Sequence, residues 1–241
     1  MIPALRRTGA TLRLNIGRQA RGGFWLVALA VAVLNAALIR ALPQGPGPWW
    51  PVIILAELAV TGFYFAAVQV LLEQAEGTLA ARAVTPMRPA EYLVALVVSL
   101  VGLALAESVA LVLIGHAGGV QWAALAAGVT FLSSLYVLYG VIAVAEYDSI
   151  GDFLLPSGVW TLVLIVPALP LLGLPGGWWL WLHPLQGAFT LIQLGFGQAR
   201  PQTALPAMLA ASAWLCGVLV LARHRLAGIA AGSRGRSWHR P

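Results

Sequence analysis

Six long runs of apolar residues limit most strongly what this chain can fold into. They cover residues 24–42, 50–72, 92–115, 122–145, 153–174 and 203–222. A helix that crosses a bilayer needs about 20 mainly apolar residues. Each run is apolar on every face, whereas a transmembrane β-strand alternates apolar and polar side chains. The sequence therefore predicts an all-α integral membrane protein with six transmembrane helices.

The composition agrees with this prediction. Hydrophobic residues make up 60% of the 241 residues, charged residues make up 9%, and the mean hydropathy is +0.87. Soluble domains contain about 45–50% apolar and about 25% charged residues. We therefore expect a single transmembrane domain over 1–241, in which 1–23 form an interfacial N-terminal helix, 24–222 form the six-span bundle and 223–241 form a basic cytosolic tail.

The positive charges predict the orientation of the chain. All 14 basic residues are arginines, and all but Arg40 and Arg200 lie before the first run, between the second and third, or after the last. Loops rich in arginine next to a span are typically cytoplasmic. We therefore expect a multi-pass protein of the plasma membrane with both termini in the cytoplasm. Attraction to anionic lipid explains the net charge of +6 without any nucleic-acid partner.

The N-terminal segment intersperses its arginines with apolar residues such as Leu12, Leu14 and Ile16. This pattern is typical of an amphipathic helix that lies in the membrane interface. Two glycines weaken a helix at this place. The alternative is a basic tail that binds lipid head groups.

A polar segment, EQAEGTLAARAVTPMRPAEYL at 73–93, separates the second and third runs. Glu73 and Glu76 are three residues apart, so they share a face if the second span continues beyond the membrane. Gly77 is a suitable place for that helix to end. Residues 78–84 are then predicted to form one short helix.

The third span is predicted to begin at the end of this polar segment. Thr85 is a suitable N-cap, Pro86 fits the first helical position, and Glu91 lies close to the positive end of the helix dipole. The expected order is helix, short transverse helix, helix. The alternative is that the segment is only a solvated loop.

Two acids, Glu57 and Glu107, lie inside the apolar runs. Carboxylates inside a membrane are costly and are therefore functional candidates. From the helical rise, both should lie about 10 to 14 Å below the outer surface, where Arg40 could pair with one of them. We expect them to line the translocation path or to bind a cationic substrate; the alternative is a polar network that holds the spans together.

The region from the fifth run to the sixth is irregular in sequence. The fifth run contains prolines that should kink or break it near its outer end; they are Pro156, Pro167, Pro170 and Pro175. The next segment, GGWWLWLHPLQGAFTLIQLGFG, is long, apolar and rich in tryptophan, which suits a membrane interface. We expect external re-entrant helices before the last span. A seventh span is the alternative, although it would place the C-terminal arginines outside.

The chain lacks the residues that several reactions need. Without any lysine it cannot form a P-loop, so it should not bind and hydrolyse ATP by itself. Its four histidines are scattered and its one cysteine, Cys216, stands alone, so no metal site is expected. Glu57 and Glu107 could serve an intramembrane enzyme only as a close, hydrated pair, and no catalytic motif surrounds them.

The sequence EGTLAARAVTPMRPAEYL resembles the cytosolic loop of ABC-2 type exporter permeases, in which Gly-Thr-Leu, Thr-Pro and Glu-Tyr-Leu follow a glutamate. The likeness is to the drug-exporter branch, which includes fluoroquinolone export permeases. WWLWLHPLQGAFTLI similarly resembles that family's external segment. The chain departs from the pattern in lacking a lysine after Glu-Tyr-Leu.

The resemblance implies a permease subunit of an ATP-driven exporter for a hydrophobic or amphiphilic substrate, drug-like or lipid. It would work as a homodimer or heterodimer with separate ATP-binding subunits, which would carry the ATP and magnesium. The alternative is a membrane assembly or heme-export-like permease subunit. By analogy, the coupling residues are Glu73, Glu76, Gly77, Thr78, Leu79, Arg82, Thr85, Pro86 and Glu91, and the external gate residues are Trp181, His183 and Pro184.

Overall fold

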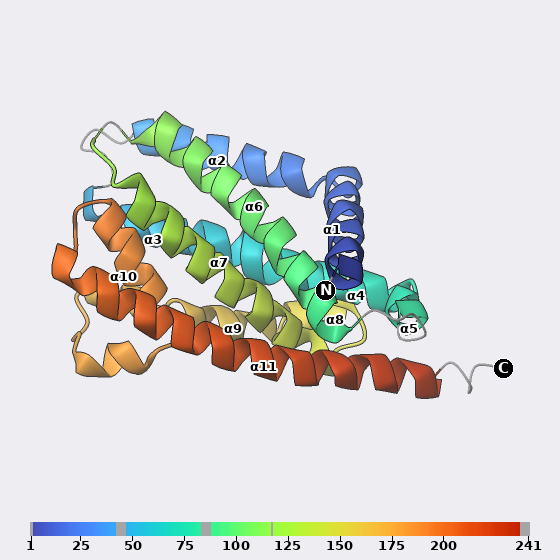
Figure 1. Ribbon diagram of the computed structural model, residues 1–241. Helices are drawn as coiled ribbons and strands as arrows, with labels where there is room; N and C mark the ends of the chain where they lie inside the picture. Colours follow the sequence, from blue (N-terminus) through green and yellow to red (C-terminus); the bar gives the residue numbers. More distant parts are fainter. Residues whose placement is uncertain (1, 42–46, 83–87, 117, 237–241) are drawn as a thin grey trace.

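The computed structural model describes residues 2–41, 47–82, 88–116 and 118–236 (Figure 1). Over these ranges the chain is helical and contains no β-strand, so the prediction of an all-α protein is confirmed. The helices are α1 (Ile2–Arg21), α2 (Phe24–Ala41), η1 (Gly47–Trp49), α3 (Trp50–Leu58), η2 (Ala59–Tyr64), α4 (Phe65–Ala75), α5 (Thr78–Arg82), α6 (Pro89–Gly115), α7 (Trp122–Ala143), η3 (Val144–Glu146), α8 (Ile150–Leu154), α9 (Ser157–Leu164), η4 (Val166–Leu172), η5 (Trp178–Leu182), α10 (Gln186–Gly195), η6 (Pro201–Thr203) and α11 (Ala204–Arg236).

Five helical stretches in the described part of the chain are long and apolar enough to cross a membrane. They are Phe24–Ala41, Gly47–Ala75, Pro89–Gly115, Trp122–Glu146 and Pro201–Gly228. We call Gly47–Ala75, which contains α3, η2 and α4, the second crossing, and Pro89–Gly115, which is α6, the third crossing. The fourth is central, because 78% of the residues in its most apolar window are buried, against 22% in the first and 17% in the last. The exposed apolar faces of α2 and α11 are therefore available to lipid or to another membrane helix.

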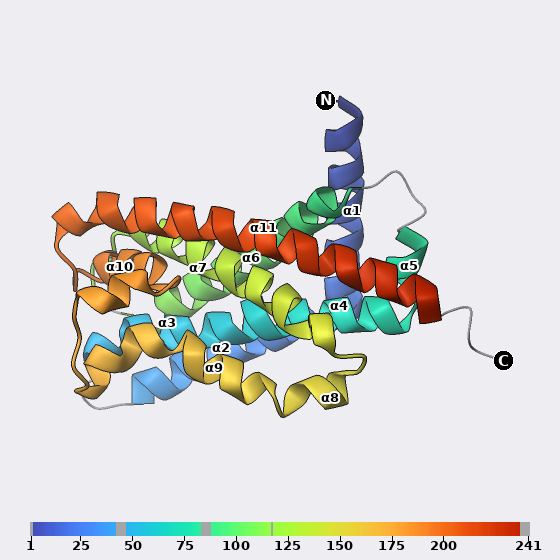
Figure 2. The ribbon, with the colours of Figure 1, turned by 90° about the horizontal axis from the view of Figure 1, so that it is seen from below.

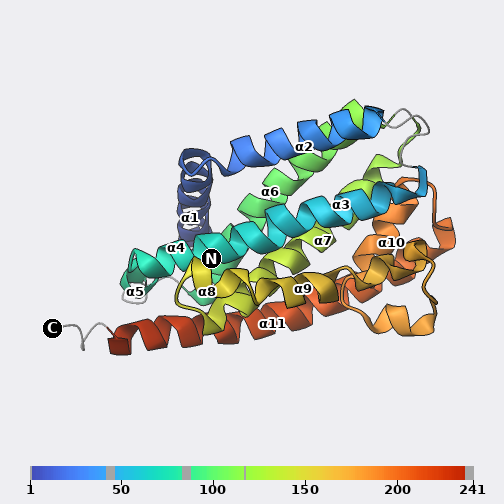
Figure 3. The same cartoon turned by 180° about the vertical axis from the view of Figure 1, so that it is seen from behind.

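The expected fifth span, residues 153–174, is divided into shorter helices. Pro156 lies at the break between α8 and α9, and Pro167 lies where η4 replaces α9. Proline has no N–H to donate and clashes with the preceding turn, which explains both breaks. The predicted interruption is confirmed, but this segment is not among the five long spans. A hydrogen bond of 2.8 Å between the Tyr64 and Thr161 hydroxyls joins α9 to η2. Helix α9 lies beside the second crossing, to which η2 belongs (Figure 3).

Glycines allow α7 to approach the second crossing closely. A Cβ atom at Gly140 would lie 2.5 Å from the carbonyl oxygen of Phe63, and one at Gly62 would lie 2.7 Å from the Tyr136 Cβ. Neither distance is tolerated by real carbon atoms. Both contacts involve η2, so the six-residue π-helix between α3 and α4 is held directly against the central helix. Small residues commonly allow such packing between membrane helices.

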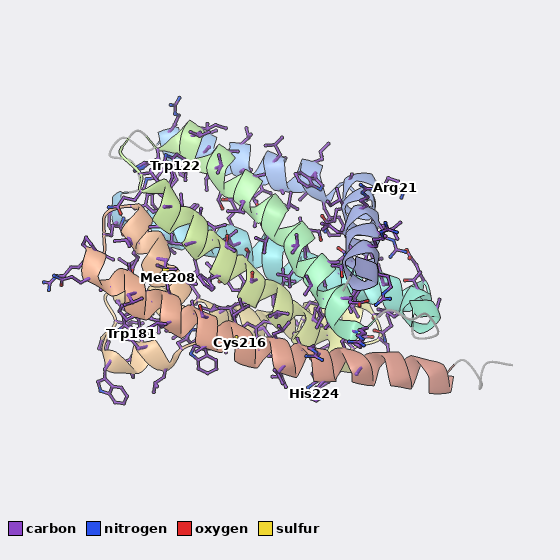
Figure 4. All side chains as sticks on the ribbon, viewed as in Figure 1. Arg21, Trp122, Trp181, Met208, Cys216 and His224 are labelled. Carbon is purple, nitrogen blue, oxygen red and sulfur yellow. The ribbon has the colours of Figure 1, made fainter. Side chains whose placement is uncertain are left out.

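The molecule has two chemically different ends. Figure 1 shows α1, α5 and the C-terminal end of α11 at one end of the bundle and α10 at the other. Figure 2 shows that α1 runs across the direction of the bundle helices. Trp122 and Trp181 lie at the α10 end, whereas Arg21 and His224 lie toward the α5 end (Figure 4).

The last helix is longer than the predicted span over 203–222. It extends to Arg236, so much of the segment expected to be a tail continues the helix. The short helix α5 packs against α11. Cys216 lies in the middle of α11 and is exposed on its surface (Figure 4).

Candidate functional site: the segment around α5 and the buried acid pair

Gly77 ends the second crossing and begins the segment around α5. Its φ angle is +70°, in the left-handed region that favours glycine. The hydroxyl of Thr78 then donates a hydrogen bond of 3.0 Å to the carbonyl oxygen of Glu73, one of the acceptors that a helix end leaves free. The structure confirms the predicted helix end and shows a short helix over Thr78–Arg82 of the predicted 78–84; residues 83 and 84 lie outside the described residues.

Leu79 fastens α5 to the rest of the bundle. Its side chain is 5% exposed and belongs to the hydrophobic core. It therefore holds the short helix in place and offers no surface to a partner. Glu76, Gly77 and Ala81 are exposed, while the side chains of Ala80 and Arg82 lie outside the described residues.

Arg18 of α1 joins the interfacial helix to the end of the second crossing. Its guanidinium lies 3.0 Å from a Glu73 oxygen and 3.6 Å from a Glu76 oxygen. The two acids share one face, as their spacing predicted. The Glu73 side chain is 2% exposed and that of Glu76 is 57% exposed, so the pair with Glu73 is the better shielded from solvent.

Arg7 makes the corresponding contact with the start of the third crossing. Its Nε and Nη2 atoms donate to the two Glu91 oxygens at 3.1 and 2.8 Å, which is a bidentate geometry. This bond raises the pKa of Arg7. Glu91 also accepts from the backbone N–H of Arg88 at 3.2 Å and so caps α6. We call the ion pairs of Arg7 with Glu91 and of Arg18 with Glu73 and Glu76 the α1 clamp.

The predicted start of the third crossing was wrong. Helix α6 begins at Pro89, with Arg88 as its N-cap, whereas Thr85 and Pro86 were expected in these positions. Pro89 offers the same fixed φ angle and missing donor as Pro86, so the sequence contained two equivalent helix starts. Thr85 and Pro86 themselves lie outside the described residues.

Helix α1 is present as predicted, but it buries its polar side. Thr11, Asn15 and Gln19 are 6%, 0% and 1% exposed, whereas Leu14 is 58% and Ile16 is 40% exposed. The side-chain nitrogen of Gln19 donates to the Ser99 hydroxyl of α6 at 2.9 Å. Leu14 and Ile16 thus face outward together with Arg13, as on a helix that lies in a membrane interface. The spacing of four between the three polar residues was the signal that sequence reasoning missed.

The structure brings the two intramembrane acids together. Glu57 and Glu107 are each 4% exposed, and the Glu57 carboxyl lies beside the side chains of Glu107 and Asn35. The hydroxyl of Thr61 lies within hydrogen-bonding distance of the Glu107 carboxyl and 3.0 Å from the Glu57 carbonyl oxygen. Thr61 belongs to the π-helix η2, a rare conformation that is frequent at functional sites.

An apolar groove lies on one side of this pair. It has a volume of about 940 Å³, lies between α2 and α6, and has Glu107 as the one charged residue among its described lining residues. The groove therefore connects the acid pair with the exposed surface of α2. Arg40 lies at the exposed end of α2, and no ion pair joins it to either acid in the described part of the chain.

His183 supports the broken helix from the opposite end of the molecule. Its Nε2 lies 3.2 Å from the carbonyl oxygen of Val163, and its Nδ1 accepts from the N–H of Leu185 at 3.3 Å. The Val163 carbonyl would normally bond to the N–H of residue 167, but residue 167 is a proline. Burial lowers the pKa of His183, so the neutral imidazole takes the place of the missing donor.

The other residues expected at the external gate lie beside His183. Trp181 is 37% exposed in η5, and Pro184 is partly buried just before α10. Helix α10 is 10 residues long, too short to cross a bilayer, and it packs on α7 and α11. Within the described residues, no three His, Cys, Asp or Glu side chains come together as a metal ion would require.

The apolar helices, the transverse helix α1 and the polar contacts around α5 define a multi-pass helical membrane protein. A model of the Fluoroquinolones export permease protein family matches residues 6–228, so the chain belongs to this family. This membership agrees with the resemblance to ABC-2 type drug-exporter permeases, and it places the chain among transport and efflux proteins of the membrane.

Two relatives carry the same family description. Both are fluoroquinolones export permease proteins, from two strains of Mycobacterium tuberculosis. Each is 28% identical over 198 residues, which cover 80% of this chain and 83% of the relative.

Proposed function

We propose that the chain is the permease subunit of an ATP-driven exporter that moves hydrophobic or amphiphilic molecules out of the cell. A separate ATP-binding subunit supplies the energy and holds ATP and magnesium. Family membership supports the export of drug-like molecules. The observation that carries the coupling is the α1 clamp, because it joins one rigid helix to both crossings that flank α5.

The contacts of α5 suit the transmission of a movement from the proposed ATP-binding subunit to the transmembrane helices. Leu79 fixes α5 to the bundle, so a force on α5 reaches α4 and α11 directly. Arg18 and Arg7 then connect α4 and α6 through α1. A small displacement at α5 becomes a rigid-body movement of several packed helices.

The proposed orientation follows from the two ends of the molecule. The end with α1, α5 and the end of α11 carries most of the arginines and faces the cytoplasm, where the anionic leaflet attracts them. The segment α8–α9–η4 forms a sixth crossing that the prolines divide, and η5 and α10 form the external re-entrant part. A second permease, identical or related, covers the exposed apolar face of α11.

Co-purification tests the coupling role of α5. The tagged chain is purified in mild detergent from its native membranes, and bound proteins are identified by mass spectrometry. We expect a P-loop ATPase with the native chain and a clear loss of it with Ala81→Asp, which adds a charge to an exposed position of α5. The matched control is Ala123→Asp, exposed in the first turn of α7 at the other end. Equal recovery of the ATPase with both variants would refute the role of α5.

A further inference from the structure

The acid pair and the groove beside it form a binding site of a definite chemical kind. We propose that Glu57 and Glu107 bind the protonated amine of an amphiphilic substrate whose apolar body lies in the groove between α2 and α6. The proposal rests on the export function proposed above and names the class of molecule that the site selects.

The hydrogen bonding of the acids is incomplete in a way that a cation would correct. Asn35 and Glu107 lie beside the Glu57 carboxyl, but neither of its oxygens has a partner in normal hydrogen-bond geometry among the described residues, although the side chain is 4% exposed. A network that serves only to hold helices together normally satisfies its buried polar atoms. An ammonium group has three donors and no acceptor, so it supplies what these oxygens lack.

The charge of the pair also favours a single cation. Two adjacent carboxyls in a medium of low dielectric cannot both ionise cheaply, so one retains a proton. The remaining carboxylate balances one ammonium group, and the protonated acid donates a hydrogen bond to that carboxylate. No arginine is paired with either acid in the described part of the chain, so the negative charge is free for a ligand.

The groove supplies the apolar half of the site. Its volume of about 940 Å³ falls within the range of small-molecule pockets, about 300–1,000 Å³. Leu29 and Val33 of α2 and Leu103 and Ala106 of α6 line it, and Glu107 stands among them. Since Leu29 is 55% exposed and Val33 is 45% exposed, the α2 wall lies at the surface of the bundle. An amphiphile dissolved in the membrane can therefore reach the acid pair sideways.

The site is built on elements that can hold it in place. Thr61 positions the Glu107 carboxyl from the π-helix η2, and Gly62 and Gly140 lock η2 against the central helix α7. Movement of the second crossing during transport therefore shifts one wall of the site relative to α6. Binding of the substrate and movement of the helices are thus linked by the same contacts.

A matched pair of probes separates charge from apolar binding. Monodansylcadaverine carries a primary ammonium group, and its N-acetyl derivative is neutral and of similar size. The purified permease is placed in phosphatidylcholine nanodiscs without any ATPase, and dansyl fluorescence is titrated after subtraction of empty discs. We expect the amine to bind about tenfold more tightly than the acetylated probe, as one buried charge pair would give.

Variants then locate the binding. The double variant Glu57→Gln, Glu107→Gln should reduce the preference for the amine to less than about twofold, because either acid alone can supply the one carboxylate, whereas Glu107→Asp should retain the preference. Ala106→Phe, an exposed groove position, should weaken both probes alike. Glu146→Gln, an exposed acid at the surface, is the matched control and should change nothing.

The outcomes of these titrations decide the binding proposal whether or not the proposed export function holds. Equal binding of the two probes to the native chain, or an unchanged preference in the folded double variant, would overturn the proposal. If the double variant does not fold, unchanged binding by Ala106→Phe would overturn it instead. Because no ATPase is present, these results are independent of the co-purification test, so the two proposals can fail separately.

Discussion

A single proline explains much of the chemistry around His183. Pro167 cannot donate to the Val163 carbonyl, and the imidazole of His183 lies 3.2 Å from that oxygen. The other ring nitrogen accepts from Leu185, so both nitrogens have partners in the neutral form. A proton added to Nδ1 would point at an N–H donor, which explains why the neutral form is favoured.

The stability of this region should depend on pH. Burial lowers the pKa of His183 below its usual 6.5, so the unfolded chain binds a proton at a higher pH than the folded one. The contribution of the neutral His183 to the stability of the folded chain is therefore complete above pH 6.5 and decreases as the pH falls below 6.5. In thermal unfolding followed from about pH 8 to about pH 5, His183→Gln should keep a donor for Val163 and show a shallower decline. Identical pH profiles for the two proteins would contradict this role.

Helix α1 is the element whose role changed most between sequence and structure. Its apolar residues predicted contact with lipid, but its polar residues proved to be the ones that pack on the bundle. Arg7 and Arg18 lie at the ends of the buried polar stripe and reach the crossings on both sides of α5. The helix therefore joins the crossings on the two sides of α5 through the α1 clamp.

Loss of the α1 clamp should uncouple export from the movement of α5. The double variant Arg7→Gln, Arg18→Gln removes the α1 clamp and leaves the exposed face of α5 intact. Export of an amphiphilic drug from cells that contain the permease and the proposed ATPase should fall several-fold, while the ATPase still co-purifies. Arg225→Gln is the matched control, because it breaks an ion pair with both side chains exposed, worth about 0–1 kcal/mol. Full export by the double variant would exclude a coupling role for the α1 clamp.

The contact between α7 and η2 should tolerate no added methyl group. Gly140→Ala would place a Cβ 2.5 Å from the Phe63 carbonyl oxygen, so the helices must separate at a cost of about 1–3 kcal/mol. Gly102→Ala in α6 is the control, because nothing lies within 4 Å of its Cβ and alanine favours a helix by about 1 kcal/mol. Thermal unfolding in detergent should show a lower Tm for the first and an equal or higher Tm for the second. Equal Tm values for both variants would contradict the close packing.

Structural features that depend on residues close together in the sequence were predicted well. The long apolar runs identified five helices, Gly77 marked the end of a crossing, and the prolines of 153–174 marked its breaks. Each of these depends on chemistry within a few residues. The two candidate helix starts near Pro86 and Pro89 show the limit, because local rules alone do not distinguish between them.

Contacts between distant residues were beyond such rules. Arg7 and Glu91 are 84 positions apart, and no local pattern pairs them. That Glu57 and Glu107 meet was expected only from their similar depth, and the groove beside them depends on how α2 and α6 pack. The partner of His183 depends on where the chain returns after the prolines.

At the scale of the whole molecule, the arginine-rich end should face the cytoplasm. With Cys216→Ala as background, single cysteines are introduced at Ala81 in α5 and Ala123 in α7, both exposed and at opposite ends. A membrane-impermeant maleimide added to intact cells should label position 123, and position 81 only after permeabilisation. The reverse pattern would place α5 outside and would exclude contact with a cytoplasmic ATPase.

The most direct measurement of the central claim is site-specific photo-crosslinking from α5. A benzophenone amino acid replaces Ala81 in one variant and Ala123 in the other, and native membranes are irradiated before purification. The account predicts a crosslinked product of the permease with a P-loop ATPase from position 81 and none from position 123. No ATPase product from position 81, or equal products from both positions, would contradict a coupling role for α5.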